Sequence, residues 1–165
     1  MSATARPQHV SLVAIPDAVI STMTGIYDVL GSFRMLGLTE PSIPLEPPFT
    51  IEIVAAQRGS VPLASGLPVD ARLAVSEVTA TDIIIVPSVL LGPDGWIPGR
   101  YPEIVDWIRR MHANGALLCS ACSGVFLLAE TGLFNGQQTT VHWGGVRKSI
   151  PARAAEPRAR ACRLG

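Results

Sequence analysis

The segment Ile83-Ile84-Ile85-Val86 is the feature that most restricts what this chain can fold into. An unbroken β-branched run favours an extended strand, and a strand without polar alternation needs cover on both faces. Such strands occupy the centre of parallel sheets, whose crossover connections place helices on the two faces. The 165 residues are enough for one such domain. The remainder of the chain should therefore contain further strands that alternate with helices.

Strand-like and helix-like segments do alternate along the sequence. We expect strands at residues 9–15, 49–56, 82–87, 116–119 and 139–142, and a hairpin at 60–69 around Ser65-Gly66. Apolar spacing predicts helices over residues 21–36, 103–113 and 124–131, and Ser21 or Thr22 is the expected cap of the first. The residues expected to face inward are Met23, Ile26, Tyr27, Leu30, Phe33 and Met35 in the first helix, and Ile104, Trp107, Ile108 and Met111 in the second. This order predicts an α/β fold, a three-layer sandwich with a mostly parallel sheet.

Composition excludes several classes of protein. Hydrophobic residues make up 48% of the chain and charged residues 16%, which indicates an ordered core and not a disordered chain. No uninterrupted apolar run approaches the roughly 18 residues of a membrane helix. Three cysteines do not form a disulfide framework. We therefore expect a soluble cytoplasmic protein that does not contact a membrane.

Charge is distributed unevenly along the chain. Residues 1–146 carry seven arginines and twelve acidic residues, whereas residues 147–165 carry six basic residues and one acid. A short basic tail can bind nucleic acid or acidic lipid, but its Ala, Arg and Pro content favours a solvated, disordered end. The acidic body has no basic stripe, so we expect no direct contact with DNA.

The segment Ala116–Val125 carries the candidate chemistry. It predicts a strand, a sharp turn of small residues and then a helix, as in a nucleophile elbow. Cys122 would lie at the helix N-terminus, where the helix dipole and free N–H groups favour a thiolate. His142, twenty residues further on, would approach the thiol as a base or an orienting partner.

Other interpretations of these residues remain open. Cys122 can be a small buried hydrophobe, and His142 a core histidine beside Trp143. Cys119 and Cys122 have the C-x-x-C spacing of a redox pair, although Cys119 is expected to end a strand. A zinc site needs a second pair of ligands that the sequence does not offer at usable spacing. We expect no metal and no cofactor.

The sequence also resembles a known family. Residues 112–143 resemble the ThiJ/PfpI superfamily, which has the class I glutamine amidotransferase-like fold, and Gly25–Val29, Ala64–Leu67 and Asp82–Pro87 fit it in the same order. The nearest branch is the N-terminal domain of AraC-type transcription regulators. The resemblance implies a flavodoxin-like sandwich, an elbow cysteine at Cys122 and a histidine at His142. It also implies a homodimer, and a domain that senses small molecules while a separate helix-turn-helix domain binds DNA.

Three departures from the family bear on the site. Catalytic relatives carry an acid in the loop before the first helix, where this chain aligns Thr22, with Asp17 five positions earlier. Ser88-Val89 stands where relatives often have Gly-Gly. The domain is expected to span residues 8–146 and to be incomplete at its C-terminus. The composition of the tail, residues 147–165, is what we expect of a truncated domain or of a frameshift in the gene near Ser149.

The resemblance and the departures together give a functional expectation. We expect a small-molecule-sensing domain of an AraC-type regulator without its helix-turn-helix domain, and an unidentified effector or substrate as its ligand. The residues expected to bind the ligand are Thr22, Ser88, Val89, Ser123 and Gly124, beside Cys122 and His142. One alternative is a hydratase or amidase with Cys122 as nucleophile, and another is a thiol redox sensor.

Overall fold

The computed structural model describes residues 6–135 and places a parallel sheet between two layers of helices. The sheet has the order β5-β2-β1-β6-β7, in which every pairing is parallel. Its strands are β1 (Gln8–Val13), β2 (Phe49–Ala55), β5 (Leu73–Ala74), β6 (Ile83–Val86) and β7 (Leu117–Ser120). A separate antiparallel hairpin pairs β3 (Gly59–Pro62) with β4 (Pro68–Ala71).

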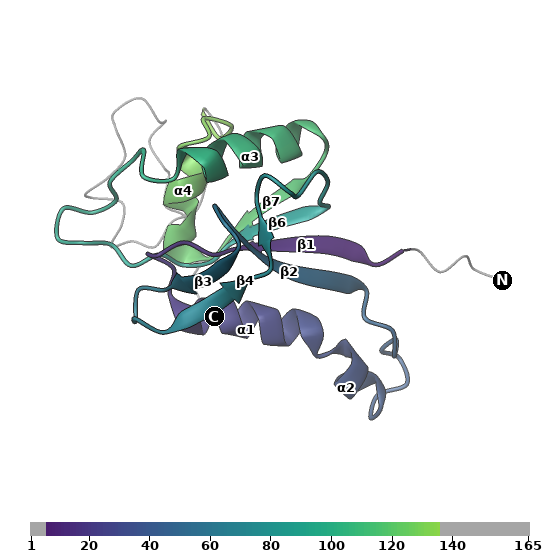
Figure 1. Ribbon diagram of the computed structural model, residues 1–165. Coiled ribbons are helices and arrows are strands. Elements are labelled where there is room, and N and C mark those ends of the chain that lie inside the picture. Colours follow the sequence, from purple (N-terminus) through teal and green to yellow (C-terminus); the bar gives the residue numbers. More distant parts are fainter. Residues whose placement is uncertain (1–5, 136–165) are drawn as a thin grey trace, which may run out of the picture.

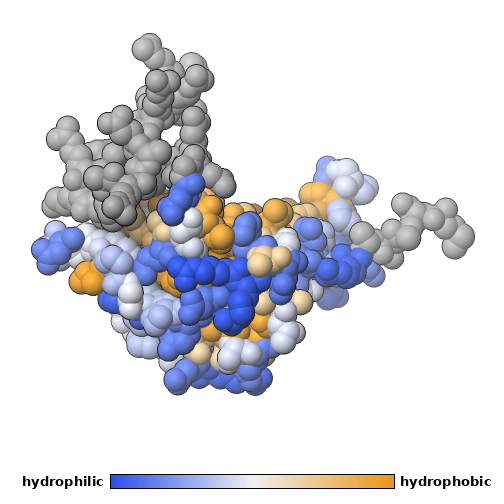
Figure 2. All heavy atoms as spheres, turned by 90° about the horizontal axis from the view of Figure 1, so that it is seen from above, coloured by the Kyte–Doolittle hydropathy of each residue, from blue (hydrophilic) through white to orange (hydrophobic). Residues whose placement is uncertain are grey.

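Helices lie on both faces of this sheet (Figure 1). On one side are α1 (Ile20–Gly31) and α2 (Phe33–Gly37), and on the other are α3 (Pro102–Ala113) and α4 (Val125–Ala129), which follows a 3₁₀ turn at Cys122–Gly124. Figure 2 looks down on the α3 side and shows hydrophilic residues across the middle of that surface. The three-layer, mostly parallel α/β fold expected from the sequence is confirmed. No helix within residues 6–135 is long and apolar enough to cross a membrane.

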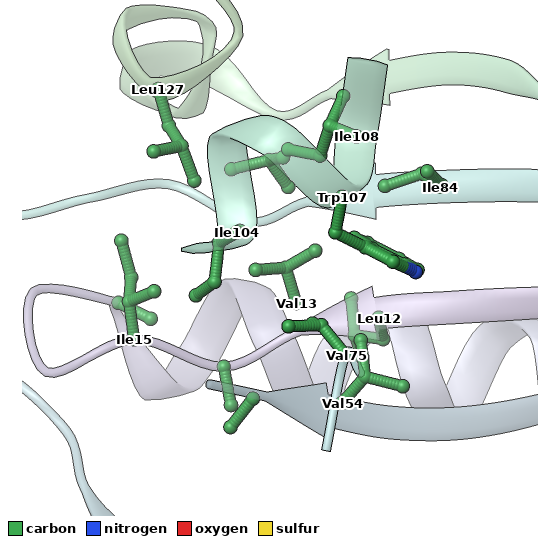
Figure 3. Close-up of a cluster of buried hydrophobic side chains, with 14 of the residues drawn as sticks. Leu12, Val13, Ile15, Val54, Val75, Ile84, Ile104, Trp107, Ile108 and Leu127 are labelled. Atoms are coloured by element: carbon green, nitrogen blue, oxygen red, sulfur yellow. The ribbon is translucent and has the colours of Figure 1, made fainter. Parts of the chain in front are cut away.

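The core on the α3 side is built around one tryptophan (Figure 3). Trp107 is fully buried, and its indole N–H donates to the carbonyl oxygen of Val78 at 3.1 Å. Ile104 and Ile108 of the same helix are buried beside it and lie over the sheet, which contributes Val54 of β2 to this core. All four residues expected to face inward on this helix, Ile104, Trp107, Ile108 and Met111, are buried. The amphipathic pattern of α3 therefore predicted its packing correctly.

The strand order fixes where a ligand site can lie. The chain runs from β1 outward to β2 and later returns to place β6 on the other side of β1. This reversal makes a topological switch point at the carboxyl ends of β1 and β6, which is where open α/β sheets bind ligands. The carboxyl end of β7 lies next to that of β6, because Val86 pairs with Ser120. The segment Cys119–Gly124 therefore begins at this edge of the sheet.

Several details of the expected elements were wrong. The helix expected over residues 21–36 divides at Ser32, whose hydroxyl donates to the carbonyl oxygen of Val29 at 2.8 Å. It is not capped by Ser21 or Thr22, because its N-cap is Val19 and no side chain bonds there.

The first helix also packs less completely than its pattern predicted. Met23 is buried, but Tyr27 is exposed because it lines an open groove beside β2, and Met35 on α2 is exposed as well. The two-residue strand β5 was not expected at all. The helix expected to run to residue 131 ends at Ala129.

Candidate functional site

The turn Ala121–Gly124 after β7, called the elbow below, has a strained backbone. The chain leaves the strand through Ala121 in an extended conformation, and Cys122 then has a φ of 47°. It is the one non-glycine residue with a positive φ among residues 6–135. A side chain in this left-handed region costs free energy, and such strain gathers at functional sites because the surrounding structure has to maintain it. The Cys122 side chain is exposed on this turn.

Gly124 allows the helix after the turn to lie against β6. A Cβ atom at this position would stand 2.4 Å from the carbonyl oxygen of Pro87 and 2.6 Å from that of Val86. No side chain tolerates such distances to backbone atoms. The predicted binding residue Gly124 is buried, so its evident role is to permit this close approach.

The two serines expected at the site are both hydrogen-bonded to backbone groups. The Ser123 hydroxyl donates to the carbonyl oxygen of Val89 at 2.7 Å and accepts the Val89 N–H at 2.9 Å. The Ser88 hydroxyl donates to the carbonyl oxygen of Ala121 at 3.3 Å, and Ser88 is 9% exposed. These bonds fasten the elbow to the loop that follows β6.

The loop before α1 joins the same assembly. Ala18 and Val89 form an antiparallel bridge, the Val19 N–H donates to the carbonyl oxygen of Ser88, and the Leu90 N–H donates to that of Asp17. Val89 is buried, and its N–H is already bonded to Ser123. The carboxyl ends of β1, β6 and β7 are therefore held as one unit.

Neither side chain that could replace the acid of catalytic relatives is free. The Thr22 hydroxyl donates to the carbonyl oxygen of Val19 at 2.9 Å. The Asp17 carboxylate forms an ion pair with Arg100, and it accepts the Tyr101 hydroxyl at 2.8 Å. Burial and this bond to Asp17 raise the pKa of Tyr101 to about 12. Thr22 thus bonds within the first turn of α1, and Asp17 ties the loop before α1 to Arg100 and Tyr101.

Hydrogen bonds to Glu130 hold the long loop between β6 and α3, and the sequence did not predict them. The Glu130 carboxylate accepts the Trp96 indole N–H at 2.6 Å and the Gly99 N–H at 2.7 Å. The Arg100 guanidinium lies 5.1 Å from the centre of the Trp96 ring and 5.3 Å from that of Tyr101. Partners this distant in sequence leave no local signal.

The remaining predicted groups are placed as follows. Cys119 lies on β7 and is exposed, as is Cys122. The strand expected at residues 139–142, which includes His142, and the tail, residues 147–165, lie outside the described residues. In the part of the chain that the structure describes, no three His, Cys, Asp or Glu side chains cluster to hold a metal ion.

Comparison with known proteins identifies the family. The DJ-1/PfpI family pattern matches residues 33–157. The chain belongs to the DJ-1/PfpI family. This assignment confirms the resemblance to the ThiJ/PfpI superfamily. Two solved structures of regulators share the fold. A putative transcriptional regulator from Vibrio parahaemolyticus has a TM-score of 0.65 at 18% identity, covering 83% of this chain and 68% of that one. An AraC family transcriptional regulator from Pseudomonas putida has a TM-score of 0.62 at 19% identity, covering 84% and 68%.

Two characterised relatives of this DJ-1/PfpI domain have different functions. The HTH-type transcriptional regulator CdhR of Pseudomonas aeruginosa is 29% identical over 96 residues, or 57% of this chain and 27% of the regulator. The isonitrile hydratase of Pseudomonas putida is 26% identical over 136 residues, or 82% of this chain and 52% of the enzyme. The chain thus spans about a quarter of one relative and about half of the other.

Proposed function

We propose that this DJ-1/PfpI domain senses a small molecule at the Cys122 elbow, as the sensing part of an AraC-type transcription regulator. The ligand would lie against the exposed Cys122 side chain. Thr22, Ser88, Val89, Ser123 and Gly124 would form the wall, and His142 would complete the site. The hydroxyls of Ser88 and Ser123 would shape this wall through their backbone hydrogen bonds. Pre-organised walls of this kind lower the cost of ordering a site on binding.

One observation favours sensing over catalysis: the position of the relatives' acid holds Thr22, and the nearby carboxylate of Asp17 is engaged elsewhere. Thr22 is bonded to its own helix, and Asp17 is held by Arg100 and Tyr101. A cysteine enzyme of the hydratase kind needs a group that moves a proton at the reacting carbon. An elbow that keeps the cysteine but has no free acid at these two positions supports binding without turnover.

The similarity to CdhR and to the AraC family structure supports the regulatory setting. On this proposal, DNA contact belongs to a helix-turn-helix domain, and the sensing domain itself does not touch DNA. We further propose that the domain acts in the cytoplasm, away from membranes, and as a homodimer. Ligand binding at the elbow would then shift the balance between two arrangements of the regulator.

A second candidate function is isonitrile hydration, which the relationship to the isonitrile hydratase and the strained, exposed Cys122 favour. The thiolate would attack the isonitrile carbon, that carbon would take up a proton, and water would then displace the sulfur to leave a formamide. The net reaction adds one water across the carbon and nitrogen of the isonitrile. It needs the proton donor that Asp17 and Thr22 do not supply in their present contacts.

The two functions separate in one set of assays. A panel of small amides, formamides, aldehydes and 2-oxo acids is screened by thermal shift, and any stabilising compound is tested for protection of Cys122 from iodoacetamide. Formamide production from cyclohexyl isocyanide is measured in parallel. Cys122→Ala is the test variant, and Cys119→Ala is its matched control, since both cysteines are exposed.

The sensing proposal expects stabilisation by at least one compound, slower alkylation of Cys122 in its presence, and no formamide above background. Formamide production that is lost in Cys122→Ala and kept in Cys119→Ala would replace sensing with catalysis. Failure of every compound in the panel to stabilise the protein would count against both a pocket and its proposed role.

A further inference from the structure

A groove on the opposite side of the sheet from α3 is a candidate binding site separate from the elbow. It encloses about 270 Å³ between α1, β2 and the β3–β4 hairpin. Its lining consists of Ile51–Ile53 of β2, Tyr27 of α1, Val69 and Asp70 of β4, and Arg72 just beyond that strand. None of these residues belongs to the elbow or to the loops tied to it.

The groove combines an apolar part with one free charge of each sign. Ile51, Ile53 and Val69 are partly buried and pack against the core. Asp70 and Arg72 are exposed, and neither side chain forms a hydrogen bond or an ion pair within residues 6–135, although only one residue separates them in sequence. Glu52 differs, because its carboxylate is paired with the His9 ring at 2.8 Å.

These features select a class of ligand. A guanidinium binds a carboxylate through two parallel hydrogen bonds, and a carboxylate side chain can accept an ammonium group. The apolar residues and the Tyr27 ring would cover a hydrocarbon group. A volume of 270 Å³ lies just below the usual range for ligand pockets, roughly 300–1,000 Å³, which fits a molecule of about ten non-hydrogen atoms.

We propose that this groove binds a free α-amino acid with an apolar side chain. Its carboxylate would pair with Arg72, its ammonium group with Asp70, and its side chain would lie on Ile51, Ile53 and Val69. The two unpaired charges of the groove, Asp70 and Arg72, would then be neutralised by one zwitterion. The site is separate from the elbow, so it would give the domain a second input that does not depend on Cys122.

The test uses L-leucine as the probe and the isoleucine methyl NMR signals of the whole chain as the readout. The expected result is a saturable shift of the Ile51 and Ile53 methyl signals. L-leucinamide lacks the carboxylate, N-acetyl-L-leucine lacks the ammonium group and L-serine lacks the apolar side chain. Each should bind at least tenfold more weakly than L-leucine.

Variants check the assignment of each charge. Arg72→Gln should weaken L-leucine binding at least tenfold, and Asp70→Asn at least threefold. Arg110→Gln on α3 is the matched control, since Arg110 is also exposed and lies outside the groove, and it should bind as the unchanged protein does. Because the substituted residues are exposed, all three variants should fold.

Three results would overturn the proposal. The first is the absence of any Ile51 or Ile53 shift with L-leucine, and the second is equal binding by L-leucine and its three analogues. Binding that Cys122→Ala abolishes would place the leucine at the elbow and would also overturn it. Loss of the proposed sensing function, in contrast, leaves these methyl shifts unchanged, so the two failures are distinguishable.

Discussion

Replacing Gly124 with alanine tests the close approach on which the elbow depends. The added Cβ would stand 2.4 Å and 2.6 Å from the carbonyl oxygens of Pro87 and Val86. These oxygens belong to the end of β6 and the residue after it, so they cannot rotate away as a flexible side chain would. Either the helix after the turn or the end of β6 must shift. Overpacking of this kind costs about 1–3 kcal/mol, and contact with backbone places the change near the upper end.

The loss of unfolding free energy in Gly124→Ala can be measured by thermal melting. For a chain of this size, roughly 2–4 °C of melting temperature is lost per kcal/mol, so we expect Gly124→Ala to melt about 4–12 °C lower. Urea unfolding followed by circular dichroism gives the same free energy independently.

Gly25→Ala is the matched control for this substitution. Gly25 lies in the interior of α1, and an added Cβ there meets nothing within 4 Å. Alanine should therefore stabilise the protein by about 0.5–1 kcal/mol through helix propensity. A Gly124→Ala protein that unfolds within about 0.5 kcal/mol of the unchanged protein would refute the described packing of the elbow against β6.

Three further predictions concern strain and ionisation. Cys122→Gly should be more stable to urea than Cys122→Ala by about 1 kcal/mol, because glycine adopts the positive φ without strain; equal midpoints would show that the turn is unstrained. Tyr101, with its pKa raised to about 12, keeps its proton in the folded state while the unfolded state loses it near pH 10. Stability should therefore fall as pH rises from about 10 to 12, and this slope should be absent from Tyr101→Phe. Asp82 has its pKa lowered to about 2 by hydrogen bonds from Arg6 and the His9 N–H. Its contribution to stability is present above pH 3.8 and is lost as pH falls through about 2, so Asp82→Asn should show a flatter acid limb in urea unfolding.

The parts of the fold that depend on a local sequence pattern were predicted best. The run Ile83–Val86 forms β6 with a neighbouring strand on each side, as an unbroken β-branched run predicts, and alternate residues of it are buried and partly buried. The break at Ser32 was not predicted, because apolar spacing continues through it and only a local serine bond marks it. The strand β5 is two residues long and is defined by pairing of Leu73 with Val54, which no local pattern reveals.

The candidate site shows the same division between local and distant information. Small residues from Ser120 to Gly124 indicated a sharp turn, and the structure has one there. The partners of the site side chains were hidden because they are far apart in sequence: Ser123 bonds to Val89, 34 residues away, and Asp17 to Arg100, 83 residues away. Residue type alone therefore located the sharp turn but could not tell which polar groups were engaged.

The most direct test of the sensing proposal is the thermal shift caused by the small-molecule panel in the unchanged protein and in Cys122→Ala. A ligand at a hundredfold excess over its Kd stabilises the folded state by about 2.7 kcal/mol, which corresponds to a rise of roughly 5–11 °C here. We predict that at least one compound produces a rise of this order in both proteins, because recognition depends on the walls of the elbow and not on thiol chemistry. A rise that is lost in Cys122→Ala, or no rise with any compound, would contradict the account.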